Sequence, residues 1–83
     1  MSSDKRRHPR KKINAVAFLY TAEGWPLGKC QIKDISTGGA RLAHALSGEI
    51  PSEFLLSLSR DGKVRRRCEV RWRTEKELGV RFL

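Results

Sequence analysis

The segment from Lys63 to Arg73 alternates between two kinds of residue at every second position. Its odd positions are Lys, Arg or Glu throughout, and its even positions are Val64, Arg66, Cys68, Val70 and Trp72. A period of two places successive side chains on opposite faces of a β-strand, so the pattern predicts a half-buried strand with one exception at Arg66. Asp61-Gly62, just before it, is typical of a tight hairpin turn.

Five other segments also have the composition or alternation of β-strands, and turn-forming residues separate them. They cover residues 13–21, 27–35, 40–43, 54–59 and 78–82. The segment 45–52 contains Gly48 and Pro51 and predicts a loop, although a single helical turn also fits. Six short strands with little helical periodicity predict an all-β fold, a six-stranded antiparallel β-barrel, because closure removes exposed sheet edges.

Two of these strands alternate clearly between two faces. One face consists of Cys30, Ile32 and Asp34 in the strand 27–35, and of Phe54, Leu56 and Leu58 in the strand 54–59. The strand 27–35 therefore places Asp34 near its end, where a turn follows.

The first twelve residues are basic and almost without apolar side chains. They include Lys5, Arg6, Arg7, Arg10, Lys11 and Lys12. Such a segment cannot drive its own burial. We therefore predict a flexible basic arm over residues 1–12 that becomes ordered on binding an anion, followed by one β-barrel domain over residues 13–83, since 83 residues leave no room for a second domain.

The net charge of the chain is +9, from 18 Lys and Arg against 9 Asp and Glu. This excess predicts a polyanionic partner, which could be a nucleotide, a nucleic acid or an acidic membrane surface. No apolar run approaches the roughly 18 residues that span a bilayer, and the polar N-terminus lacks the apolar core of a signal peptide. The expected protein is cytoplasmic, without insertion into a membrane.

The residue types required for metal binding or catalysis do not cluster in the sequence. Cys30 and Cys68 are far apart, without C-x-x-C spacing or a nearby pair of histidines, which argues against zinc. They are expected to be reduced and buried, with a single disulfide as the alternative. His8 and His44 are isolated, and no second carboxylate accompanies Asp34. We expect neither an enzyme nor a cofactor.

Two short motifs have the residue types that a guanine nucleotide requires. Arg6 and Arg10 form R-x-x-x-R, with Arg7 and Lys11 as a second possible frame, and Asp34-Ile35-Ser36-Thr37-Gly38-Gly39 has the form D-x-S-x-x-G. A guanidinium can bridge phosphate oxygens, hold guanine O6 and N7 with two hydrogen bonds, or stack on a base. A carboxylate can accept from guanine N1-H and the exocyclic amine.

Each motif has an ordinary alternative explanation. A run of Arg and Lys is often a solvated tail with nonspecific affinity for anions. The combination of Asp, Ser and Gly is common in turns, where Ser36 would bond to its own backbone and one of Gly38 and Gly39 would take a positive φ. The order and separation of the two motifs, together with the strand pattern, favour the nucleotide interpretation.

This pair of motifs, in this order, resembles the PilZ domain family. The end of the chain, with Val70-Arg71-Trp72 followed by Gly79-Val80-Arg81-Phe82, is similar to the last two strands of that family. The resemblance implies a small β-barrel that binds the bacterial second messenger cyclic di-GMP without catalysis. It also implies that binding orders the arm and changes the surface shown to a downstream protein partner.

Carried over to this chain, the resemblance predicts a set of ligand-binding residues. The principal ones are Arg6, Arg7, Arg10, Asp34, Ser36 and Gly39, and the secondary ones are Lys5, Gly38, Arg41 and Trp72. Lys5, just before R-x-x-x-R, could hold a phosphate of a second ligand molecule. The resemblance thus allows a monomer that dimerises with ligand. The family's C-terminal helix, which would support contacts between subunits or with partners, has no counterpart here.

Several alternatives stay open at this level. Arg41 fits a phosphate contact and a solvent-facing strand residue equally well, and Trp72 on an apolar face is more typical of core than of a ligand-flanking aromatic. The basic face of the segment 63–73 is most simply a solvated strand face. A barrel for single-stranded nucleic acid is less favoured because Asp34 does not suit a polyanion, and a PilZ-like scaffold for protein partners is the third possibility.

Overall fold

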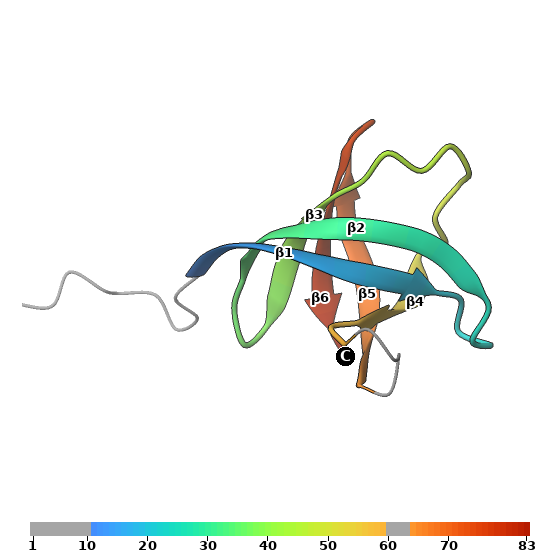
Figure 1. Ribbon diagram of the computed structural model, residues 1–83, viewed down its shortest axis with the longest axis horizontal. Coiled ribbons are helices and arrows are strands. Elements are labelled where there is room, and N and C mark those ends of the chain that lie inside the picture. Colours follow the sequence, from blue (N-terminus) through green and yellow to red (C-terminus); the bar gives the residue numbers. More distant parts are fainter. Residues whose placement is uncertain (1–10, 60–63) are drawn as a thin grey trace, which may run out of the picture.

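The computed structural model describes residues 11–59 and 64–83, and six strands make up its regular structure. They are β1 (Lys11–Tyr20), β2 (Pro26–Ile35), β3 (Gly39–Ala43), β4 (Glu53–Ser57), β5 (Arg65–Arg73) and β6 (Glu77–Phe82). All neighbouring strands are antiparallel, and they close into a barrel in the order β1-β2-β3-β6-β5-β4 (Figure 1). The predicted all-β barrel is confirmed.

The inward-facing side chains of all six strands form one apolar core. Its fully buried members include Leu19, Leu42, Phe54, Leu56 and Leu78. The segment between β3 and β4 is irregular and forms no helical turn, and it contributes the buried side chain of Ile50 to the core. The barrel thereby gains apolar contacts beyond those that its own strands provide.

A β-bulge in β2 corrects the predicted position of Asp34. Ile32 pairs with Leu42 on β3, but the next pair joins Asp34 to Arg41, so Lys33 is an extra residue on β2. An extra residue shifts the register by one and moves the following side chains to the other face. Asp34 therefore shares a face with Arg41, outside the barrel, and not with Cys30 and Ile32 as the simple alternation predicted.

A second bulge changes the course of β5 in the same way. Val70 pairs with Val80 and Trp72 pairs with Gly79, which leaves Arg71 as the extra residue. The alternation predicted for β5 holds for Cys68, which is fully buried, but not for Trp72, which is 45% exposed. The interpretation of Trp72 as a core residue is therefore wrong, because the bulge turns its side chain outward.

The face predicted for the end of the strand 54–59 is also wrong after Leu56. Ser57 is fully buried and Leu58 is 44% exposed, the reverse of the expected alternation. The hydroxyl of Ser57 donates a hydrogen bond to the carbonyl oxygen of Ser59 at 2.9 Å. Such a local side-chain bond replaces the strand ladder, so β4 ends at Ser57 and the period of two ends with it.

Residues 1–10 and the predicted hairpin turn at 61–62 lie outside the described residues. The expected basic arm over residues 1–12 falls largely in the first of these segments. In the described part of the chain, no helix is long and apolar enough to cross a membrane.

Candidate functional site

Ser36 organises the turn that joins β2 to β3. Its backbone N-H donates to the carbonyl oxygen of Gly39 at 2.8 Å. Its hydroxyl oxygen accepts the N-H groups of Gly38 and Gly39, each at 3.2 Å. The hydroxyl thus bonds within its own turn, as expected of a turn serine, and it satisfies donors that the strands leave unpaired.

Gly39 is required by close packing and not by a positive φ. Among the described residues only Gly24 and Gly28 have positive φ angles, so the expectation that Gly38 or Gly39 takes one is wrong. A Cβ at Gly39 would overlap the backbone carbonyl oxygen of Val80 on β6. The absence of a side chain lets the start of β3 lie directly against β6.

The turn is also tied to β6 at its other glycine. The carbonyl oxygen of Gly38 accepts a hydrogen bond from the N-H of Phe82 at 2.9 Å. The hydrogen bond to Gly38 and the close packing of Gly39 together therefore fix the position of the turn relative to β6. The D-x-S-x-x-G motif is thus a rigid turn on three adjoining strands.

Asp34 lies in an ion-pair network on the outer face of the barrel. Nε of Arg41 donates to Oδ2 of Asp34 at 3.0 Å, and Nη1 of Arg41 lies 3.7 Å from Oε1 of Glu77. The Asp34 side chain is only 12% exposed, whereas that of Arg41 is 39% exposed. Arg41, which the sequence left between two roles, holds the carboxylate in a fixed direction.

Asp34 and Trp72 belong to one row of residues that crosses four strands. Asp34 pairs with Arg41, Arg41 pairs with Gly79, and Gly79 pairs with Trp72. Directly paired residues of antiparallel strands share a face. Because Ala40 and Leu42 on either side of Arg41 are fully buried, this row lies outside the barrel. Three strand spacings of about 4.8 Å give it a length of roughly 14 Å.

Gly79 provides the space that the Trp72 side chain occupies. A Cβ at Gly79 would overlap the indole of Trp72, so the ring lies directly over this glycine. Large aromatic rings that cover a cross-strand glycine stabilise a sheet and remain partly exposed. The row therefore presents the guanidinium of Arg41 and, over Gly79, the indole of Trp72.

The strand pairing brings the start of β1 next to this turn. Lys11 pairs with Ile35, and Lys12 pairs with Asp34 (Figure 1). The chain therefore enters the barrel beside the end of β2, one residue after Arg10. Lys5, Arg6, Arg7 and Arg10 lie outside the described residues, but their point of attachment is adjacent to the D-x-S-x-x-G turn.

The model of the PilZ domain family matches residues 4–83, nearly the whole chain. The chain belongs to the PilZ domain family. A search of curated proteins found no match. PilZ domains are in general receptors for cyclic di-GMP and non-catalytic binding domains. The family match thus covers both motifs and all six strands.

Two residues of this PilZ domain's outer face were missed in the sequence. Glu77, the second partner of Arg41, lies in a segment that reads as a polar connection. Gly79 stands between Leu78 and Val80 in a plain alternation, and only its pairing with Trp72 gives it a role. A glycine in a strand is a sign of close approach by another group, and this was the available signal for Gly79.

The two cysteines of the PilZ domain are free and buried in the core, and no disulfide joins them. Burial raises the pKa of Cys30 to about 12, and the neighbouring Cys68 adds to this effect. Burial likewise raises the pKa of Cys68 to about 12. Both thiols stay protonated at neutral pH and have little nucleophilic character. In the described residues, no group of His, Cys, Asp and Glu has the geometry to hold a metal ion.

Proposed function

We propose that this PilZ domain is a non-catalytic receptor for cyclic di-GMP, which binds between its N-terminal arm and the β2–β3 turn. The register of β1 on β2 carries the proposal, because Lys11 lies opposite Ile35 and Lys12 opposite Asp34. R-x-x-x-R at Arg6 and Arg10 is thereby attached at the edge of the D-x-S-x-x-G turn. In this proposal, the two motifs that are separated in the sequence form one binding surface.

Asp34 has the role of reading the guanine edge in this proposal. Its carboxylate is an acceptor-only group with room for several donors, so it can accept N1-H and the exocyclic amine while Arg41 holds one of its oxygens. Ser36 and Gly39 hold the turn in the position that lets Asp34 contact the ligand. The hydrogen bond at Ser36 and the close packing of Gly39 against β6 support this role. Neither of them needs to touch the nucleotide to be required.

The arginines of the arm supply the charge that the ligand's phosphates need. Arg6 and Arg10 would each use the planar fork of a guanidinium on a phosphate or on guanine O6 and N7, and Arg7 provides a second frame. Binding would order the arm at a cost in conformational entropy, which the charge-assisted hydrogen bonds offset. The ordered arm changes the surface that a downstream protein partner meets.

Trp72 extends this proposed site along the outer face of the barrel. The residue is 45% exposed and lies in the same row as Asp34. An aromatic ring of this kind can stack on a nucleobase, an interaction of about 1–3 kcal/mol. Lys5 and Gly38 complete the proposed ligand-binding set, and Lys5 would matter most if the domain binds two ligand molecules or dimerises with ligand.

Arg41 acts in this account through Asp34, which predicts that their effects on binding are not additive. Arg41→Ala should weaken binding of cyclic di-GMP by about fivefold to tenfold in the wild type but by less than about twofold when Asp34 is already Ala. Titration calorimetry on the four proteins of this double-mutant cycle measures the difference. Arg67→Ala, on the far part of β5, is the control with no expected change.

An arginine at position 41 that binds phosphate by itself would give a different cycle. Its removal would then cost the same factor with or without Asp34, and the positioning role would be wrong. The conservative Arg41→Lys variant should bind cyclic di-GMP little better than Arg41→Ala, because an ammonium cannot reproduce the directed Nε-H bond to Oδ2 of Asp34.

Competition experiments test the proposed function against the nucleic-acid alternative. Fluorescent cyclic di-GMP should be displaced by the unlabelled dinucleotide and poorly by GTP. Arg10→Ala should weaken binding by about 30-fold or more, since charge-assisted hydrogen bonds contribute roughly 1.5–3 kcal/mol each. Displacement by a single-stranded oligonucleotide that is unaffected by Asp34→Ala would support the alternative instead.

A further inference from the structure

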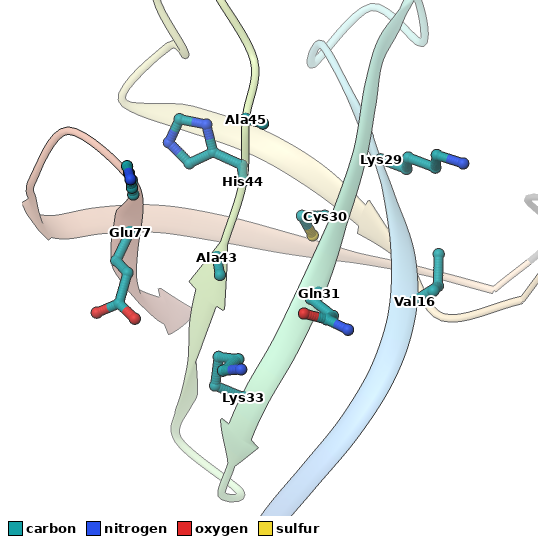
Figure 2. A pocket seen from close by; sticks show the side chains of 10 residues that line it. Val16, Lys29, Cys30, Gln31, Lys33, Ala43, His44, Ala45 and Glu77 are labelled. Atoms are coloured by element: carbon teal, nitrogen blue, oxygen red, sulfur yellow. The ribbon is translucent and has the colours of Figure 1, made fainter.

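A depression on the described surface lies beside the proposed nucleotide site and not within it. It has a volume of about 540 Å³ and is formed by β1, β2, β3, the start of β6 and the residues next to these strands. Figure 2 shows His44 and Glu77 on one side of it and Lys29 and Val16 on the other. None of the predicted ligand-binding residues that the structure describes lines it. The nucleotide proposal therefore gives this surface no role.

Apolar side chains line part of this depression, and one of them also lines a second depression. Val16, Ala43 and Ala45 line the first depression. Val16 also lines a neighbouring depression of about 230 Å³, together with Phe18 and Leu58. Val16 is 55% and Leu58 44% exposed. Contiguous exposed aliphatic side chains with a polar rim are typical of surfaces that bind other proteins.

The rim of the same surface is basic. Lys29, Lys33 and Lys76 line the larger depression, and none of them forms a salt bridge with another described residue. Among the described residues that line it, Glu77 is the only one with a carboxylate, and its Oε1 lies 3.7 Å from Nη1 of Arg41. Charge complementarity thus selects a partner with carboxylates around an apolar anchor.

The charge of the chain restricts the kind of partner further, whereas the barrel does not. Each described strand has a neighbour on both sides, but residues 11–17 of β1 have no pairs with β4 and residues 26–30 of β2 have none with β3, so strand edges remain beside this surface. A second copy of this chain carries a net charge of +9 and is a poor match for three lysines. A different, acidic protein segment is therefore the partner that the charges favour.

We propose that the surface formed by Val16, Lys29, Lys33, Ala45, Leu58 and Lys76 is the docking site for an acidic segment of a partner protein, with aliphatic side chains that fill the depressions. The aliphatic anchors bind over Val16 and Leu58, and their flanking carboxylates meet the lysines. This inference concerns a surface separate from the nucleotide site and does not depend on cyclic di-GMP. Glu77 and Arg41 link the two surfaces, so a docked segment lies one ion pair away from Asp34.

Selection from a displayed library of random twelve-residue peptides tests this proposal with the full chain as target. Recovered peptides should be enriched in Asp and Glu around Leu, Ile or Phe. Their affinity should fall by about tenfold or more for Lys29→Glu and for Val16→Ser. Arg67→Glu is the matched control, because it makes the same change in net charge at an exposed site on β5, and it should change affinity by less than about twofold.

Three results would overturn the proposal. The first is that no binding peptide is recovered, and the second is that the recovered peptides lack acidic and aliphatic enrichment. The third is an equal loss of peptide affinity for Lys29→Glu and Arg67→Glu, which would indicate nonspecific attraction to a basic protein. Titration of each variant with cyclic di-GMP tests the proposed function separately from the docking site. Lys29→Glu and Val16→Ser should retain the nucleotide affinity of the wild type, which also verifies that they fold.

Discussion

Replacement of Asp34 by alanine is expected to lower the affinity for cyclic di-GMP by at least about 100-fold. The carboxylate would accept two hydrogen bonds from one guanine, and hydrogen bonds to a charged group contribute roughly 1.5–3 kcal/mol each. A loss of about 3 kcal/mol corresponds to roughly 100-fold in the dissociation constant. The variant should remain folded, since its partner Arg41 has a 39% exposed side chain and can turn to solvent.

Two variants make this result specific to the guanine edge. Asp34→Asn retains one acceptor oxygen of nearly the same shape, so it should keep more affinity than Asp34→Ala. Glu53→Ala removes a carboxylate on β4 that lies 3.7 Å from Arg67, and it should leave binding unchanged. An Asp34→Ala protein that binds within about threefold of the wild type would exclude Asp34 as the residue that reads guanine.

Replacement of Gly39 by alanine is expected to destabilise the barrel strongly. The added methyl group would overlap the carbonyl oxygen of Val80, a backbone atom that cannot move without displacing β6. Overpacking of this kind costs about 1–3 kcal/mol, a large part of the stability of a small domain. The melting temperature should fall by roughly 8–16 °C for each 2 kcal/mol lost. Thermal unfolding followed by circular dichroism measures this change.

Gly48→Ala is the matched control for this prediction. No atom lies within 4 Å of a Cβ at Gly48, and its φ angle is not positive, so the substitution should leave the melting temperature nearly unchanged. A Gly39→Ala protein as stable as the Gly48→Ala protein would mean that β3 does not lie so close to β6. Weakened nucleotide binding by a folded Gly39→Ala protein would still agree with the proposal that binding requires the position of this turn relative to β6.

The alternation of side chains was enough to predict the barrel and most of its core. Cys30, Ile32 and Cys68 occupy the buried positions that the period of two assigned to them. The failures at Asp34 and Trp72 have a common cause. Each follows one extra residue in its strand, and a bulge depends on how a partner strand pairs and leaves no clear mark in a single sequence.

The candidate site was predictable in its residue types and only partly in its geometry. The D-x-S-x-x-G pattern located the turn, but the sequence did not reveal that Ser36 bonds to its own backbone or that Gly39 packs against β6. The pairing of Arg41 with Asp34 and Glu77 depends on contacts between β2, β3 and the start of β6. Such contacts arise from strand order, which local patterns do not specify.

Titration calorimetry of the unmodified chain with cyclic di-GMP is the most direct test of the central claim that the arm and the turn form one receptor site. We predict a saturable exothermic isotherm at micromolar concentrations of protein and ligand, at one or two ligands for each chain, and a dissociation constant higher by about 30-fold or more for Arg10→Ala and by about 100-fold or more for Asp34→Ala. An absence of binding at these concentrations, in a chain that circular dichroism finds folded, would contradict the claim.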